Sequence, residues 1–155
     1  MGIQTEKDGR AFYVKASLDT QDEGGRALFA HLAEDELMHL AMLEGQLASL
    51  RRDGAWQPTV EPSPAKMATP IFARELSAAE LNHLTSDLSA LRLAYLIERD
   101  AVAFYSHAAH ETDAPEGKAM FEALVAMEQG HYNRLVGEYS LLSEQFKHAM
   151  GFEPF

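Results

Sequence analysis

Apolar residues recur along this chain in steps of three and four positions, on both sides of a proline-rich middle. One stripe runs through Phe29, Leu32, Glu36, His39, Leu43, Leu47 and Leu50, and a second through Phe121, Leu124, Glu128, His131, Leu135, Tyr139 and Leu142. Such steps place residues on one face of an α-helix. In both stripes a glutamate and a histidine interrupt the apolar residues at the same two places, so each stripe predicts a helix with a polar pair on its buried face.

Two further segments show the same spacing. The shorter contains Glu6, Tyr13 and Ala16 and ends near residue 19, and the longer runs from Leu88 through Glu98 to Tyr105. The period-two alternation and β-branched residues that are typical of strands are scarce. The pattern therefore predicts an all-α protein, a bundle of four helices.

The connections between these helices indicate how they are arranged. Short turns at 20–25 and 112–117 make each pair an antiparallel hairpin. Four of the six prolines lie between 58 and 70 and mark a linker at about 53–73. This connection is long enough to run the ~40 Å length of a helix, so the second and third helices can lie parallel. We expect one domain over 1–155, with hairpin one at 1–51, a crossover at 52–85 that includes a short helix at 76–84, and hairpin two at 86–150.

The two hairpins are repeats of each other. An offset of 92 residues aligns Glu6–His39 with Glu98–His131 without a gap, and 13 of these 34 positions are identical. Unrelated segments of this composition would share two or three, so duplication is the better explanation. A packing repeat alone needs only apolar residues on the buried stripe, whereas this repeat also preserves glutamate and histidine there.

The repeated polar residues form the pattern of a binuclear metal site. Glutamate and histidine three residues apart on a helix point the same way. The candidate ligands are one glutamate from each of two helices and Glu-x-x-His from each of the others: Glu6, Glu36, His39, Glu98, Glu128 and His131. Four ionised glutamates in a dry core repel one another strongly, and two divalent cations would compensate them. This ligand chemistry favours two iron ions, with manganese or zinc as possible alternatives.

Two tyrosines belong to the same pattern. Tyr13 and Tyr105 lie seven residues beyond Glu6 and Glu98, on the same helix faces. Each is placed to hydrogen-bond a ligand carboxylate from across the bundle. Aromatic residues at helical spacing are more often simple core, and the sequence leaves both interpretations open.

Other histidines have a simpler interpretation. A third Glu-x-x-His, Glu80 and His83, has no partner at the offset of 92, and His107 and His110 align with Lys15 and Leu18. We expect these residues to be solvated, and His31 and His148 to be exposed. For the six candidate ligands, the competing interpretation is a set of buried Glu–His hydrogen bonds that packs the bundle.

Composition limits the remaining possibilities. The net charge of −11 disfavours nucleic acid and anionic membranes as partners. The absence of cysteine excludes disulfides, thiolate-ligated zinc and iron–sulfur clusters. No apolar run is long enough to span a membrane, and the first residues lack a secretory signal pattern, so we expect a cytoplasmic location.

The motifs resemble those of the rubrerythrin-like branch of the ferritin-like superfamily, in its stand-alone form without a rubredoxin domain. The resemblance rests on the segments Glu6-Lys-Asp-Gly-Arg-Ala-Phe-Tyr and Glu98-Arg-Asp-Ala-Val-Ala-Phe-Tyr and on the two segments that contain Glu-x-x-His. It implies a ferritin-like four-helix bundle with a di-iron centre, commonly dimeric, in which Glu36 and Glu128 bridge the ions. Glu6 and His39 would then serve one ion, and Glu98 and His131 the other.

This resemblance leads to three functional hypotheses. The first is a di-iron oxidoreductase in which two ferrous ions give two electrons to hydrogen peroxide or dioxygen, with re-reduction by an external electron donor. The second is a ferritin-like protein that stores or buffers iron. The third is a structural dimeric bundle whose site holds zinc or nothing.

Overall fold

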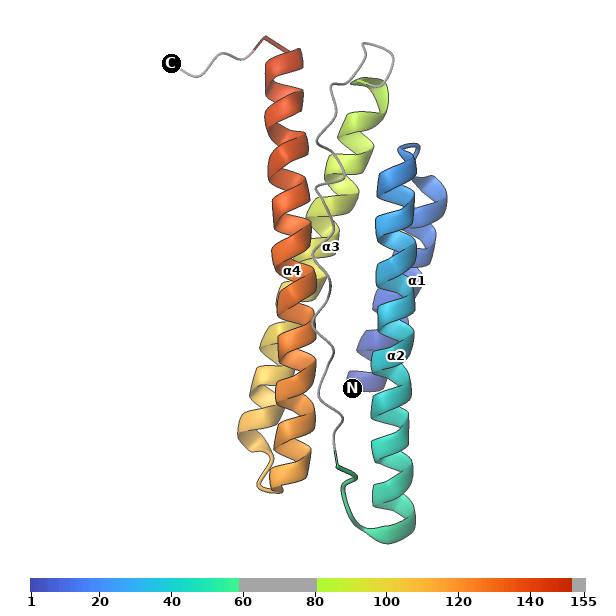
Figure 1. Cartoon of the computed structure of the whole chain (residues 1–155), viewed down its shortest axis with the longest axis vertical. Coiled ribbons are helices and arrows are strands. Elements are labelled where there is room, and N and C mark those ends of the chain that lie inside the picture. Colours follow the sequence, from blue (N-terminus) through green and yellow to red (C-terminus); the bar gives the residue numbers. More distant parts are fainter. Residues whose placement is uncertain (59–80, 152–155) are drawn as a thin grey trace.

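Four α-helices make up most of the computed structural model, which describes residues 1–58 and 81–151. They are α1 (Gly2–Asp19), α2 (Glu23–Asp53), α3 (Leu81–Glu111) and α4 (Pro115–Ala149). Figure 1 shows α1 beside α2 in one hairpin and α3 beside α4 in the other. Helices α2 and α3 run in the same direction. The predicted all-α bundle of two antiparallel hairpins is confirmed.

The helix ends follow from local sequence. The Asp22 side chain accepts a hydrogen bond from the backbone N–H of Gly25 at 2.8 Å and caps the start of α2. Helix α2 stops at Gly54, whose φ of 66° lies in the left-handed region that glycine adopts without strain. Helix α4 begins with Pro115, whose missing N–H is no loss in a first turn. The two short turns are thereby fixed at matching places in the repeat.

The helices next to the crossover are longer than predicted. Helix α2 continues to Asp53 rather than 51, and α3 begins at Leu81 rather than 86. Residues 81–84 of the expected separate short helix therefore belong to α3. No proline or glycine separates them from the rest of α3, and Leu84 is buried, so the buried face of α3 already begins in its first turn. The remainder of the predicted crossover, 59–80, lies outside the described residues.

The buried stripe of α2 also changes course near its end. Leu47 and Leu50 are only half-buried, whereas Gln46 and Ser49 are buried. The chain turns back after Gly54, and the Gln46 side chain exchanges two hydrogen bonds with the backbone of Gln57, at 3.1 and 2.9 Å. Buried polar side chains are tolerated here because backbone groups satisfy them.

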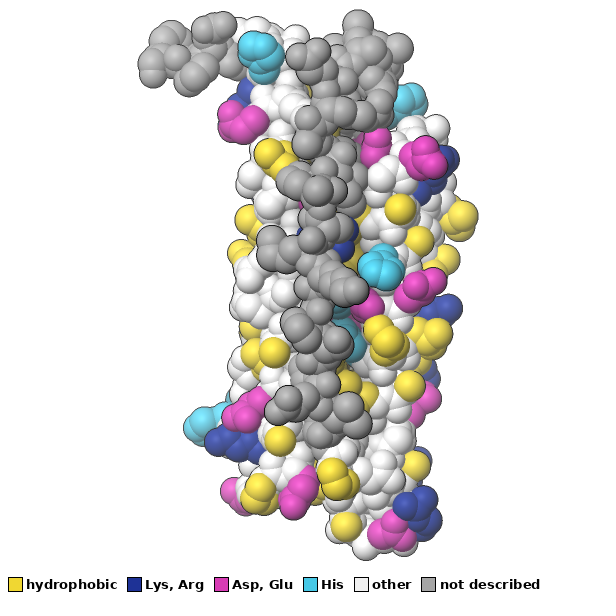
Figure 2. Space-filling view, in the orientation of Figure 1, with side chains coloured by type: hydrophobic (Ala, Val, Ile, Leu, Met, Phe, Trp, Pro, Cys, Tyr) yellow, Lys and Arg dark blue, Asp and Glu magenta, His cyan; other side chains and the backbone are white. Residues whose placement is uncertain are grey.

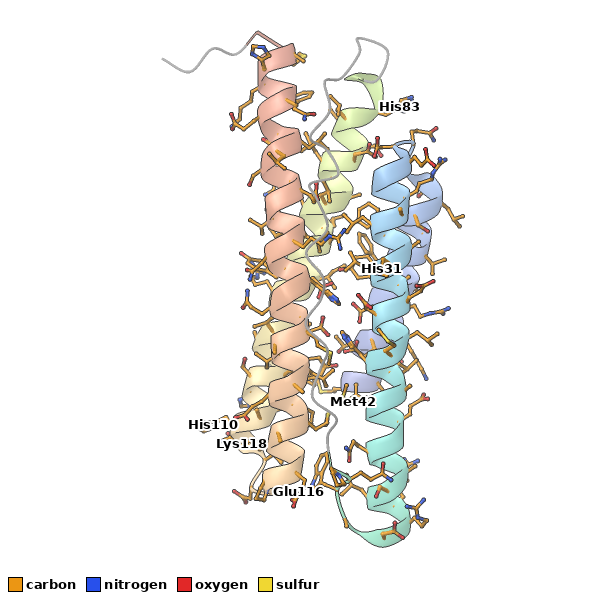
Figure 3. The ribbon with its side chains drawn as sticks, in the orientation of Figure 1. His31, Met42, His83, His110, Glu116 and Lys118 are labelled. Carbon is orange, nitrogen blue, oxygen red and sulfur yellow. The ribbon has the colours of Figure 1, made fainter. Side chains whose placement is uncertain are left out.

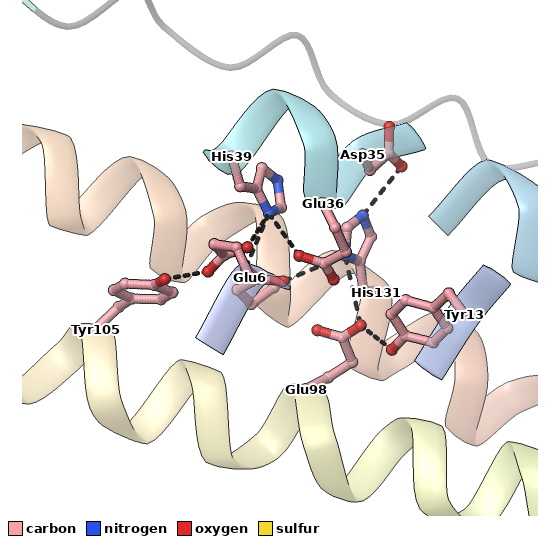
Figure 4. Close-up of polar contacts among 9 residues, drawn as sticks. Glu6, Tyr13, Asp35, Glu36, His39, Glu98, Tyr105 and His131 are labelled. Carbon is pink, nitrogen blue, oxygen red and sulfur yellow. Dashed lines mark hydrogen bonds and ion pairs between the residues drawn. The ribbon is translucent and has the colours of Figure 1, made fainter. Parts of the chain in front are cut away.

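The apolar core consists of two clusters. One includes Tyr13, Phe29 and Leu91, and the other includes Tyr105 and Leu124. A group of glutamates and histidines lies between the two tyrosines (Figure 4). Two apolar clusters therefore enclose a polar centre from both ends.

Charged side chains of both signs are scattered along the face drawn in Figure 2, with no concentration of Lys and Arg. None of the helices, over the residues described, is both long and apolar enough to cross a membrane.

Candidate metal centre

The six candidate ligands converge in the middle of the bundle, with every helix contributing. Each is at most 6% exposed: Glu6 from α1, Glu36 and His39 from α2, Glu98 from α3, and Glu128 and His131 from α4. They form two groups in which one ligand atom per residue lies within 4.8 Å of the others. The first group is Glu6, Glu36, His39 and Glu128, and the second is Glu36, Glu98, Glu128 and His131. Both groups share Glu36 and Glu128.

One nitrogen of His39 faces three carboxylates. Its Nδ1 lies 3.0 Å from Glu128, 3.3 Å from Glu6 and 3.4 Å from Glu36. A ring nitrogen has at most one N–H to donate, and here it forms a well-oriented hydrogen bond with none of them. Four donor atoms directed at a common point are the arrangement of a cation site.

His131 repeats this geometry and adds a partner of its own. Its Nδ1 lies 3.3 Å from Glu128 and 3.7 Å from Glu98. Its Nε2 is hydrogen-bonded to Asp35 on α2 at 3.2 Å (Figure 4). Asp35 was not among the residues predicted from the sequence, because the residue 92 positions later is Met127 and no repeated signal marks it. Its position directly before Glu36 is the signal in the sequence that could have indicated Asp35.

The two tyrosines hydrogen-bond carboxylates of the opposite hairpin. The Tyr13 hydroxyl donates to Glu98, and the Tyr105 hydroxyl donates to Glu6. Both rings are fully buried and stack on a phenylalanine of their own hairpin, with ring centroids 6.3 and 6.2 Å apart. Each tyrosine hydroxyl donates to Oε1 of its glutamate, and Oε2 has no hydrogen-bond partner. The free oxygens are therefore held in a fixed direction.

The pKa values show what the ligand set does without cations. Burial raises the pKa of Glu36 to about 8, against the opposing effect of His39. Burial alone would lower the pKa of His39, but the facing carboxylates of Glu128, Glu36 and Glu6 raise it to about 12. In the same way Asp35 and Glu128 raise the pKa of His131 to about 10, against the effect of burial. Protons are thus retained at the places where cations would neutralise the same charges.

The residues present fit a pair of divalent metal ions. Six buried atoms of the cluster lack a hydrogen-bond partner: Oε2 of Glu6, Oε2 of Glu98, both carboxylate oxygens of Glu128, and Nδ1 of His39 and of His131. Unpaired buried polar atoms cost free energy, and metal coordination would satisfy all six. Oxygen donors mixed with imidazole suit iron or manganese.

The remaining histidines lie away from this centre. His31, His83, His107, His110 and His148 are exposed. Figure 3 labels three of them at separate places on the surface. Glu80, the expected companion of His83, lies outside the described residues.

A helical bundle whose core presents four carboxylates and two imidazoles has the architecture of ferritin-like proteins with a carboxylate-bridged binuclear site. Comparison with known families agrees, because residues 1–139 match the family described as Rubrerythrin. The chain therefore belongs to the rubrerythrin family. No curated protein and no solved structure matches it.

Proposed function

We propose that this protein is a binuclear non-haem iron oxidoreductase that oxidises Fe(II) while reducing hydrogen peroxide or dioxygen. The observation that carries the proposal is the pair of overlapping ligand groups with Glu36 and Glu128 in common. A shared carboxylate can offer one oxygen to each of two ions. One carboxylate shared from each hairpin would therefore hold two ions as a coupled pair.

The other residues define the two ion positions. Glu6 and His39 belong to one group, and Glu98 and His131 to the other. The two buried tyrosines each hold one carboxylate oxygen, so the free oxygen cannot rotate away. The apolar clusters at either end exclude water, which strengthens the electrostatic hold on the ions.

Two bound iron ions would supply the two electrons that reduction of a peroxide O–O bond requires. The chain has no cysteine, so no thiol of its own can return those electrons. We therefore propose an external electron donor. We also propose that the protein is a homodimer, as the family resemblance implies.

Metal content tests the site. Protein purified without added metal is compared with Glu36→Ala and Glu128→Ala, because each substitution removes a carboxylate that both ligand groups use. Glu122→Ala is the matched control, since Glu122 is an exposed residue of α4. We expect about two iron ions per chain in the parent and control, and loss of iron in both core variants. Unchanged metal content in the core variants would refute the site.

Rapid mixing tests the reaction. The Fe(II)-loaded protein is mixed separately with hydrogen peroxide and with dioxygen, and oxidation is followed by absorbance. Rapid oxidation by at least one of them supports the proposal, and the faster oxidant identifies the substrate. Slow oxidation by both would overturn it.

Further measurements distinguish the proposed function from iron storage and from a structural zinc site. Iron storage requires a closed shell of many subunits that takes up far more than two irons per chain, which a sizing column and an iron titration would reveal. Zinc in the purified protein, with no iron exchange, would indicate a structural site instead.

A further inference from the structure

The two ion positions are not supported equally. The hairpins match at all six candidate ligands, but the residue before the shared glutamate differs: it is Asp35 on α2 and Met127 on α4. Asp35 accepts a hydrogen bond from His131 of the opposite hairpin at 3.2 Å (Figure 4). The thioether of methionine is only a weak acceptor, so Met127 cannot offer His39 an equivalent bond.

This bond determines which nitrogen of His131 is free to bind metal. A neutral imidazole carries one N–H, and a carboxylate at Nε2 draws the proton there. Nδ1 then keeps its lone pair and lies among the carboxylates of Glu98 and Glu128. The same contact fixes the ring orientation and makes the free nitrogen a stronger donor. Met127 cannot orient the ring of His39 or select its tautomer in this way.

The contact between Asp35 and His131 lies at the edge of the buried cluster, closer to solvent than His39. The Asp35 side chain is 24% exposed and the His131 side chain 8%, compared with 2% for His39. The carboxylate of Asp35 also adds a negative charge beside the Glu98 and His131 position. Orientation, tautomer and charge therefore all favour cation binding at the same one of the two positions.

We propose that Asp35 is a positioning residue that makes the two ion positions unequal, so that the position of Glu98 and His131 fills first and holds its ion more tightly. This inference rests on the proposed function, because it assumes two ion positions. It goes beyond that function in assigning an order of loading, and in predicting a state with one ion per chain at low metal concentration.

The test is an anaerobic titration of the metal-free protein with Co(II), whose visible spectrum reports ligand geometry without turnover. We expect two resolved binding steps in the parent. Asp35→Ala should weaken the first step by about 10- to 100-fold, the usual effect of removing a partner of a metal-bound histidine. Asp35→Asn should restore part of the loss, because an amide oxygen still accepts the Nε2–H bond but carries no charge.

Two comparisons separate the contact between Asp35 and His131 from the general effect of a lost charge. Glu34→Ala removes the same charge from an exposed neighbour on α2 and should leave both steps unchanged. With His39→Ala as background, Asp35→Ala should weaken the remaining binding strongly, whereas with His131→Ala as background only the smaller effect of the lost charge should remain. Helix content and thermal unfolding of every variant are measured by circular dichroism, and affinities are compared among the folded ones.

The outcomes separate this inference from the proposed function. Two equal Co(II) steps, or a first step unaffected by Asp35→Ala, would overturn the role of Asp35 and leave the binuclear centre standing. A parent protein that binds no Co(II) would overturn the centre itself and the inference with it. An equal loss from Glu34→Ala would reduce the role of Asp35 to general electrostatics and would also overturn the proposal.

Discussion

The metal-free protein should lose stability as the pH rises from 6.5 to 8. The reason lies in Glu36, whose pKa is raised by burial from 4.5 to about 8. The unfolded carboxyl loses its proton near pH 4.5, whereas the folded one keeps it until about pH 8. Between these values the folded state binds the extra proton, so the free energy of unfolding falls with rising pH.

The size of the effect follows from the number of retained protons. Each contributes about 1.4 kcal/mol per pH unit, so Glu36 alone accounts for about 2 kcal/mol over this interval. His39 and His131, whose pKa values rise from 6.5 to about 12 and about 10, act in the same direction above pH 6.5. The lowered pKa of Glu128 matters only below its ordinary value of 4.5. For a chain of this length, the share of Glu36 alone, about 2 kcal/mol, corresponds to roughly 4–8 °C in Tm, and the two histidines add to this fall.

Thermal unfolding followed by circular dichroism at pH 6.5, 7.2 and 8 measures this, with and without bound metal. Cations replace the retained protons, so the metal-loaded protein should show a much smaller fall in Tm. Glu36→Gln should reduce the fall in the metal-free protein, while Glu34→Gln, at an exposed position of the same helix, should not. A metal-free protein that is more stable at pH 8 than at pH 6.5, or equal slopes with and without metal, would refute the reasoning.

Two other predictions concern the hydrogen bonds of the buried tyrosines and the packing at two glycines. Tyr13→Phe and Tyr105→Phe each remove a hydrogen bond to a buried carboxylate and should each lower the free energy of unfolding by about 1.5–3 kcal/mol in urea titrations. The control is Tyr132→Phe, at a half-buried position of α4, which should lower it by less than about 0.5 kcal/mol. Changes as small as this in Tyr13→Phe and Tyr105→Phe would contradict the prediction. At Gly117 an added Cβ would lie 2.6 Å from an indole carbon, so Gly117→Ala should cost about 1–3 kcal/mol. Gly45→Ala, with open space around it, should instead stabilise α2 by about 0.5–1 kcal/mol in the same assay. Similar changes in the free energy of unfolding for Gly117→Ala and Gly45→Ala would contradict this.

Predictions from the sequence succeeded for features that depend on neighbouring residues or that are repeated along the chain. Helical spacing is a property of neighbouring residues, so it predicts four helices and the face that each one buries. The duplication then identifies the polar residues that packing alone does not require. These two signals were enough to select every residue of the two overlapping ligand groups, from Glu6 to His131.

Errors arose where no local signal exists. The limits of the crossover were misplaced because helix length depends on burial, as Leu84 shows in the first turn of α3. The buried places of Gln46 and Ser49 depend on the backbone that folds back over them after Gly54. Neither the burial of Leu84 nor these hydrogen bonds to the returning backbone can be inferred from residue spacing along one helix.

By itself, the sequence determined the helices, the hairpin repeat and the candidate ligands. Only the tertiary structure decided which groups meet across the bundle. It showed that Glu36 and Glu128 belong to both ligand groups, that each tyrosine reaches a glutamate of the other hairpin, and that Asp35 contacts His131. The physical reason is that periodicity fixes the direction of a side chain relative to its own helix, whereas a hydrogen bond or a shared ligand depends on the distance between two helices that only packing sets.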